Sequence, residues 1–120
     1  MNDKPIEVLF YPATGDKTPV RKTLAPVPIL GMLGAMQKLV DGFIEVIPHP
    51  GNKDLLIVCD EEGKMKDKVY NRPVLVDGHV TSFIFGDFFV CRNAGEEMVS
   101  LTEEDIEFLM ADRFLSGGMV

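Results

Sequence analysis

The sequence has no tryptophan and only two cysteines and two histidines among its 120 residues. A small disulfide-stabilised scaffold needs more cysteine, and no Cys-x-x-Cys or Cys/His spacing predicts a zinc site. No stretch approaches the roughly 20 apolar residues of a membrane-spanning helix, and no secretory signal is visible at the N-terminus. We therefore expect a cytoplasmic protein without metal, cofactor or membrane contact, in which Cys59 and Cys91 are reduced, buried and structural.

Basic residues are also few, with 12 Lys and Arg against 19 Asp and Glu, which gives a net charge of -7. An acidic chain is a poor direct binder of nucleic acid. Residues 96–120 hold seven acids and one base, so this segment carries -6 of that charge. One interpretation is an acidic DNA mimic that inhibits a DNA-binding protein. We favour the simpler interpretation that half of these acids mark the start of a helix, where the helix dipole stabilises them.

The signatures of common catalytic sites are missing as well. There is no Gly-x-Ser-x-Gly elbow and no glycine-rich phosphate loop. His49 and His79 lie in proline- and glycine-rich surroundings, so we expect both to be exposed loop residues. No catalytic residue is therefore predicted.

With 46% apolar residues, the chain is long enough to bury one core, and we expect residues 1–120 to form a single domain. The continuous apolar run at Leu55–Cys59 predicts a strand buried on both faces, in the interior of a sheet. Asn71-Arg72-Pro73 is expected to be irregular, because the residue before proline avoids helical dihedrals. The predicted strands are Ile6–Tyr11, Val20–Leu24, Phe43–Pro48, Leu55–Cys59, Val80–Phe85, Phe88–Arg92 and a short one around Met98–Ser100.

Two helices are predicted from their apolar periodicity. The first runs from Ile29 to Val40, and Gly42 supplies its stop. The second begins after the N-cap Thr102, with acids in its first turn, and ends at Gly117 or Gly118. Its apolar stripe is Ile106, Leu109, Met110 and Phe114, and Leu101 with Ile106 is placed for a hydrophobic staple.

These elements predict an α+β domain in which a mostly antiparallel, twisted sheet is covered on one face by two helices. Partial closure of the sheet into a small barrel is left open as an alternative.

Five segments, taken in order and with their spacing, carry a resemblance to a known family; they are Leu39–Val46, Ile57–Lys64, Asn71-Arg72, Gly86–Val90 and Ser100–Ile106. The chain resembles domain-of-unknown-function family 3846, small proteins of phages, plasmids and bacteria, from about Leu33 to the end of the last helix. The resemblance implies a cytosolic accessory protein of a mobile element or its host, and it brings no established activity. The chain departs from the family pattern at Asp41, where a second glycine is typical, and in the long apolar insert Asn71–Phe85.

Glu45, Asn71, Arg72 and Asp87 form the candidate ligand-binding set. Glu45 is the lone charge in an apolar strand, and Arg72 could pair with it through a bidentate guanidinium contact. One interpretation is a structural salt bridge that pins a loop, with Glu45 on the solvent side of an edge strand. The other is a polar pocket in which Arg72 binds an anionic ligand and Asn71 supports it.

We expect a non-catalytic binding module for a host protein or a small anionic ligand. Two alternatives stay open, an enzyme with an unrecognised polar site around Glu45 and Arg72 and the acidic DNA mimic. Neither the oligomeric state nor the identity of the ligand can be read from the sequence.

Overall fold

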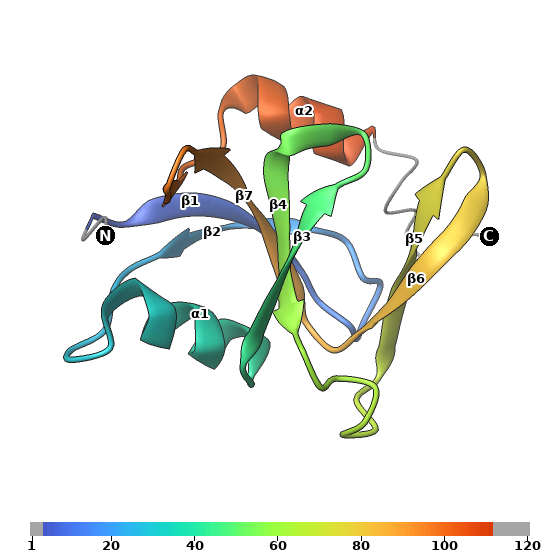
Figure 1. Cartoon of the computed structure of the whole chain (residues 1–120), viewed down its shortest axis with the longest axis horizontal. Coiled ribbons are helices and arrows are strands. Elements are labelled where there is room, and N and C mark those ends of the chain that lie inside the picture. The colour runs from blue at the N-terminus through green and yellow to red at the C-terminus, as the bar shows by residue number, and fades with distance from the viewer. Residues whose placement is uncertain (1–3, 112–120) are drawn as a thin grey trace.

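A computed structural model of the chain describes residues 4–111. The predicted end of the last helix at Gly117 or Gly118, and its apolar residue Phe114, lie outside these residues. The elements in chain order (Figure 1) are β1 (Ile6–Tyr11), β2 (Val20–Leu24), α1 (Gly31–Val40), β3 (Ile44–His49), β4 (Asn52–Asp60), β5 (Tyr70–Val76), β6 (His79–Phe85), β7 (Phe88–Ala94), β8 (Glu97–Val99) and α2 (Glu103–Met110).

The main sheet is antiparallel throughout and stays open, which settles the question of closure into a barrel. Its strand order is β2-β1-β7-β4-β3, and β8 pairs with the end of β7. As predicted, β4 lies in the interior of this sheet, between β7 and β3. Val90 in β7 lies opposite Leu9 on one side and Ile57 on the other. The late strand β7 therefore joins the two earlier hairpins into one sheet.

Strands β5 and β6 form a separate two-stranded sheet, and the expectation of an irregular stretch at Asn71-Arg72-Pro73 was wrong. The ladder has register shifts between Tyr70 and Arg72 and between Val74 and Leu75. These irregularities break the alternation on which a strand prediction depends. Pro73 is accommodated because both strands of a two-stranded sheet are edge strands. The apolar insert seen in the sequence is thus this hairpin.

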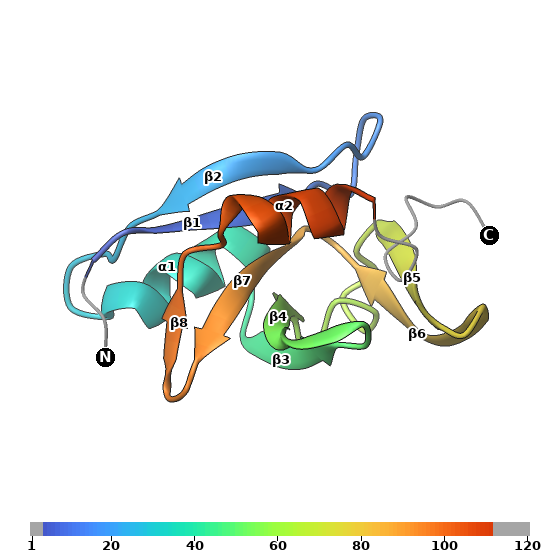
Figure 2. The ribbon, with the colours of Figure 1, turned by 90° about the horizontal axis from the view of Figure 1, so that it is seen from above.

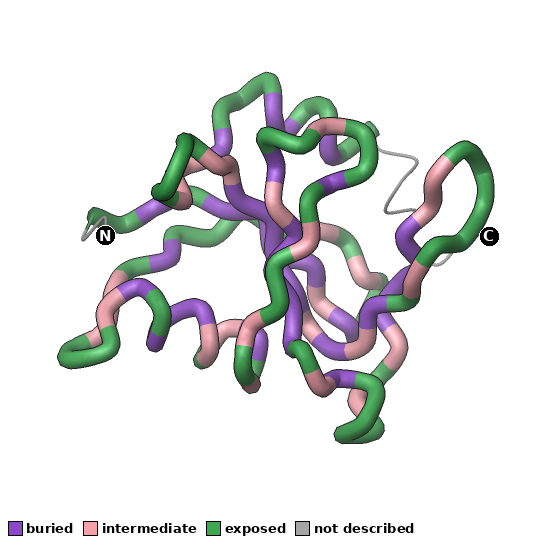
Figure 3. The backbone as a smooth tube through the Cα atoms, in the orientation of Figure 1, coloured by how far each residue is buried: buried purple, intermediate pink, exposed green. Residues whose placement is uncertain are grey.

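The two helices cover opposite faces of the main sheet, so the expectation of one covered face was wrong (Figures 1 and 2). Consecutive residues of β7 divide between two cores: Phe88 packs in the core that includes Leu109 of α2, and Phe89 in the core that includes Met36 of α1. The β5–β6 hairpin joins the α2 side through Ile84. Figure 3 shows the buried residues concentrated in the middle of the molecule and the turn of the β5–β6 hairpin exposed. Two sparse apolar stripes cannot reveal which face of a sheet each helix covers.

The N-terminus of α2 confirms the prediction that Thr102 is the N-cap of the second helix. The Thr102 hydroxyl accepts a hydrogen bond from the Asp105 amide at 3.0 Å, and the Asp105 carboxylate accepts one from the Thr102 amide at 2.9 Å. Asp105 thus completes the capping box that Glu or Gln more often supplies. Leu101 and Ile106, the predicted staple, are both buried in the same core.

Helix α1 is shorter than predicted because it begins at Gly31 instead of Ile29. Ile29 lies in a turn with a φ of 71° and a relative exposure of 102%. The helix ends at Val40, and Asp41 adopts the left-handed conformation with a φ of 57°. Asp41, and not the predicted Gly42, thus holds the left-handed position that ends the helix, a conformation that glycine adopts at no steric cost.

His49 corrects another expectation, because it is a buried strand residue and not an exposed loop residue. It is 1% exposed, its Nδ1 accepts a hydrogen bond from the Gly51 amide at 2.9 Å, and its ring meets Phe108 of α2 edge-on. His79 is exposed, as expected, but it is the first residue of β6 and not a loop residue. The flanking prolines made a loop appear the better prediction, but His49 is the last residue of β3, at a strand end that α2 covers.

Cys59 and Cys91 are free and buried, as predicted. Burial, followed by the nearby charges of Glu45 and Asp60, raises the pKa of Cys59 to about 12, and burial raises the pKa of Cys91 to about 12. Within residues 4–111 there is no helix with the length and apolar character needed to cross a membrane.

Candidate functional site

A buried carboxylate organises one end of the main sheet, where β4 ends. Asp60 is 5% exposed, and its carboxylate accepts hydrogen bonds from Lys68 Nζ at 2.6 Å, Lys66 Nζ at 3.1 Å and the Glu62 amide at 2.9 Å. Burial alone would raise the pKa of Asp60, but these hydrogen bonds outweigh it and hold the pKa below its ordinary value. Asp60 is therefore charged and its charge is compensated.

The Lys68 ammonium also ends helix α1. It donates to the carbonyl oxygens of Val40 at 2.8 Å and Asp41 at 2.7 Å, which a helix end otherwise leaves to solvent. Two glycines allow this close approach. A Cβ on Gly42 would lie 2.5 Å from the Asp60 carboxyl group, and a Cβ on Gly86 would lie 2.7 Å from Lys68 Cδ. Lys68 thus fastens α1 to the loop between β4 and β5.

Asn71 continues the polar network into the hairpin. It is fully buried, and its Nδ2 donates to the carbonyl oxygens of Tyr11 and Gly86, both at 2.9 Å. Its Oδ1 accepts a hydrogen bond from Arg72 Nε at 3.0 Å. The Asn71 side chain, which belongs to β5, is therefore bonded to β1 and to the turn that precedes β7. It links the two sheets.

Arg72 is 2% exposed, and its guanidinium is committed to the interior. It donates to the Lys17 carbonyl oxygen at 2.6 Å and stacks over the Tyr11 ring at 4.8 Å. The Lys17 side chain in turn contacts β5, where its Nζ donates to the carbonyl oxygens of Tyr70 and Asn71 at 2.9 and 3.0 Å. This reciprocal contact fixes the β1–β2 loop against β5. Arg72 thus pins the β1–β2 loop through the Lys17 backbone carbonyl, whereas the structural interpretation of the sequence was a salt bridge with Glu45.

The other two candidate residues lie apart from this pair. Asp87 is half-buried, and its Oδ1 accepts a hydrogen bond from the Ala13 amide at 2.8 Å. Glu45 is exposed on β3, which is an edge strand of the main sheet. The structure thus brings Asn71 and Arg72 together, and Asp87, in the turn between β6 and β7, contacts the same β1–β2 loop that Arg72 contacts. Glu45 lies on the exposed edge of β3, whereas Arg72 is buried.

A groove between α1 and β2 contains residues that the sequence analysis missed. Its volume is about 450 Å³. We call it the helix groove; it is lined by Phe10, Lys22, Leu24, Ala25, Val27, Ala35, Lys38, Leu39 and Asp87. Lys22 and Lys38 are both exposed, and the Lys22 ammonium lies 4.2 Å from the centre of the Phe10 ring. Their charge was visible in the sequence, but their proximity depends on how α1 lies against β2.

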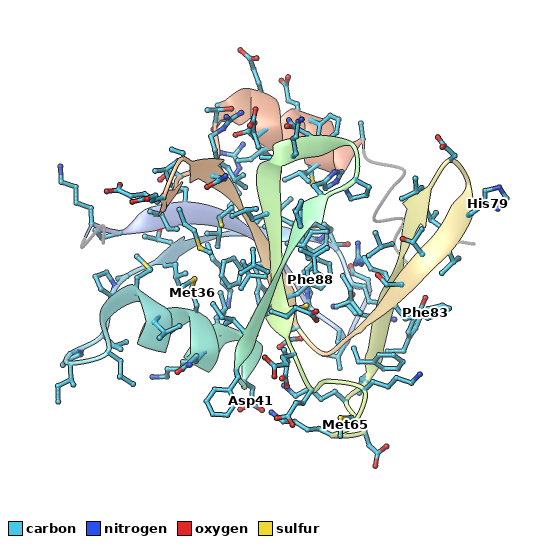
Figure 4. The ribbon with its side chains drawn as sticks, viewed as in Figure 1. Met36, Asp41, Met65, His79, Phe83 and Phe88 are labelled. Carbon is cyan, nitrogen blue, oxygen red and sulfur yellow. The ribbon has the colours of Figure 1, made fainter. Side chains whose placement is uncertain are left out.

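No group of three or more His, Cys, Asp and Glu side chains in residues 4–111 is placed to hold a metal ion. Figure 4 shows that the labelled residues Phe83, His79, Met65 and Asp41 point away from the middle of the molecule, where Phe88 and Met36 are packed.

The fold is that of a small α+β domain with one open antiparallel sheet and an attached hairpin. The chain belongs to the family described as domain of unknown function (DUF3846), whose model matches residues 7–115. No curated protein and no solved structure matches the chain.

Four of the five segments that carried the resemblance contribute to the polar network, whereas Ser100–Ile106 contains the capped start of α2. Gly42 lies against Asp60, Lys68 contacts the end of α1, and Asn71 binds the Gly86 carbonyl. These four segments thus meet around the end of α1, the end of β4 and the turn before β7, and Asn71 joins the two sheets there. This gives them a structural explanation that requires no ligand.

Proposed function

We propose that this protein is a non-catalytic binding module for a small amphipathic anion, and that the helix groove is its binding site. The observation that carries the proposal is the pair of exposed lysines, Lys22 and Lys38, beside a largely apolar groove. A groove of about 450 Å³ falls within the roughly 300–1,000 Å³ of typical small-molecule sites.

The charges of the groove favour an anion although the whole protein is acidic. Two lysines and Asp87 give the lining a net charge of +1, on a chain whose net charge is -7. One carboxylate oxygen of Asp87 is already used by the Ala13 amide. The other carboxylate oxygen of Asp87 can accept a hydrogen bond from a lysine or from a hydroxyl group of the ligand. The two ammonium groups bind the anionic end of the ligand.

The apolar lining residues of the groove favour an apolar group next to the charged end of the ligand. Leu24 and Ala35 form part of the buried core on the α1 face, and Val27 and Leu39 pack against it while partly exposed. An alkyl or aromatic group placed there would bury apolar surface that is now in contact with water. A carboxylate or phosphate with a short apolar body meets both requirements.

The proposal keeps the setting that the resemblance implies, a cytoplasmic accessory protein of a phage, mobile element or bacterial host.

The test compares octanoate with octanamide, its uncharged analogue of similar size, by NMR titration of the full chain. We expect octanoate to perturb amides of α1 and β2 and to bind about tenfold more tightly than octanamide, because a charge-assisted contact is worth roughly 1.5 kcal/mol. The double variant Lys22→Met/Lys38→Met should lose that preference. The control Lys53→Met/Lys64→Met makes the same change in charge at exposed positions outside the groove and should retain it.

Equal binding of octanoate and octanamide, or equal loss of octanoate binding in both double variants, would refute the proposal. So would the absence of any shift at α1 and β2 at millimolar octanoate. A third variant, Ala35→Leu, places a larger side chain in the groove and should weaken both compounds together. Thermal unfolding of each variant checks that the fold is retained.

A further inference from the structure

Strand β3 has an unpaired backbone edge in the described part of the chain, where it pairs with β4 alone. The Phe43 carbonyl accepts the Glu61 amide, and the Glu45 carbonyl faces Cys59 Sγ at 3.8 Å, so both point toward β4. Because backbone groups alternate along a strand, the amides and carbonyls of Ile44 and Val46 point outward. The backbone of Pro48 also faces outward, but proline has no amide hydrogen to donate. The free edge is therefore limited to a short stretch.

A slot lies beside this edge, between β3, the end of β4 and strand β6 of the hairpin. Its volume is about 160 Å³, and Glu45, Ile47, Cys59, Ser82 and Phe83 are among its lining residues. That volume suits one or two side chains better than a whole small molecule. The slot is on the hairpin face of the sheet, because Cys59 and Ile84 belong to the core on that side. The helix groove lies on the other face.

The slot offers charge and apolar surface together. Glu45 and Glu61 are exposed carboxylates and Lys64 is an exposed base, which gives a net charge of -1. Asp60 also lines the slot, but Lys66 and Lys68 already compensate its charge. Phe83, 58% exposed on β6, and the partly exposed Ile47 on β3 supply the apolar surface. A partner that fits must carry positive charge, apolar side chains and free backbone groups.

We propose that β3 binds an extended segment of a partner protein, which adds to the sheet as a further strand and directs basic and apolar side chains into this slot. In this mode of recognition, main-chain hydrogen bonds to a sheet edge supply affinity and side-chain pockets supply specificity. A basic residue of the segment lies against Glu45 and Glu61, and an aliphatic residue fills the slot beside Ile47. The short free edge makes the contact a transient one.

The probe is the peptide Lys-Val-Lys-Val-Leu-Val-Lys, whose alternate residues place lysines and leucine on one face and valines on the other. In an NMR titration of the full chain, we expect the amides of Ile44 and Val46 to shift and to exchange more slowly with solvent. The peptide Glu-Val-Glu-Val-Leu-Val-Glu should bind at least about tenfold more weakly, because it meets like charges at the rim. The peptide Lys-Val-Lys-Pro-Leu-Val-Lys, whose proline removes a main-chain donor, should also bind more weakly.

Two variants separate a strand-addition site from general attraction to an acidic protein. Glu45→Lys/Glu61→Lys should abolish binding of the basic peptide, whereas Glu96→Lys/Glu97→Lys, the same charge change in the exposed β7–β8 turn and β8, should retain it. Val46→Pro should also abolish binding, because it removes an outward amide, and thermal unfolding verifies its fold.

Equal binding of the basic and acidic peptides, perturbation centred away from β3, or no binding at millimolar peptide would overturn the proposal. The outcome is independent of octanoate binding, because the slot and the helix groove lie on opposite faces and share no lining residue.

Discussion

The Lys68 ammonium lies 2.6 Å from the Asp60 carboxylate and also donates to the Val40 and Asp41 carbonyls at the end of α1. A single side chain therefore compensates a buried charge and ends a helix. The Lys68 side chain is 16% exposed and the Asp60 side chain is fully buried. Removing one member of such a pair is expected to cost far more than breaking a surface salt bridge, because the other charge remains buried.

The first prediction is that Lys68→Met lowers the free energy of unfolding by about 3 kcal/mol, because Asp60 loses its closest counter-charge. Urea denaturation of both proteins measures the difference. Lys64→Met is the matched control in the same loop; its side chain is exposed and the change should stay within about 0.5 kcal/mol. Equal effects of the two substitutions would show that the buried contact adds nothing.

The second prediction concerns acid. The pKa values of Asp60 and Asp105 are both lowered from the ordinary value of aspartate. For Asp60, burial would raise the pKa, but the hydrogen bonds from Lys68, Glu62 and Lys66 outweigh it; for Asp105 the bidentate contact from Arg92 is the main cause. A carboxylate whose pKa is lower in the folded state stabilises that state above the unfolded pKa. This stability is lost as pH falls through the folded value.

We therefore expect the urea midpoint to decline steeply below about pH 4, where the carboxylates of the unfolded chain take up protons first. The comparison is Asp60→Asn/Asp105→Asn, which should be less stable at neutral pH and show a shallower decline in acid. An unchanged slope in this double variant would assign the acid sensitivity to other groups.

The third prediction is that Thr102→Ala lowers the free energy of unfolding by about 1 kcal/mol through loss of the α2 cap. Thr102→Ser keeps the hydroxyl that accepts the Asp105 amide and should stay close to wild type. Thr14→Ala, at an exposed turn position, controls for the substitution itself. Chemical denaturation distinguishes these variants, and a loss of the same size with Ser would argue against the hydroxyl.

The fourth prediction is that Ile29→Gly stabilises the protein by about 1 kcal/mol. A β-branched residue at a φ of 71° is strained, and an exposed side chain gives up almost no buried surface when it is removed. Leu30→Gly is the control, because Leu30 has a φ of -84° and its Cβ packs beside Gly34, so this change should destabilise. A lower melting temperature for Ile29→Gly would show that the turn needs the isoleucine.

Local signals in the sequence predicted most of the elements of this fold. The cap at Thr102 and the bounds of β1 and β2 were correct because neighbouring residues determine them. Strand β5 was missed because its register shifts and Pro73 disturb the alternating pattern. The face that each helix covers could not be predicted, since it depends on the order of strands distant in sequence.

In the candidate site too, features set by neighbouring residues could be predicted, and contacts between residues distant in sequence could not. Asn71 and Arg72, predicted as ligand-binding residues, lie together, and their partners include the Tyr11 and Lys17 carbonyls, which have no sequence signature. Lys68 was overlooked because its role appears only when the end of α1 meets the loop after β4. Lys22 and Lys38 lie beside one groove for the same reason, the packing of α1 against β2.

The position of β7 has a consequence for the protein during its synthesis. This strand lies in the middle of the sheet, yet it is made after β1 to β6, and its pairing of Val90 with Leu9 spans most of the chain. A nascent chain that ends before β7 holds the β1–β2, β3–β4 and β5–β6 hairpins without the strand that unites the first two. Isolated hairpins are marginally stable in water. Cooperative folding on the ribosome must therefore wait until β7 has left the exit tunnel, and a ribosome stalled earlier would display an unfolded, protease-sensitive chain.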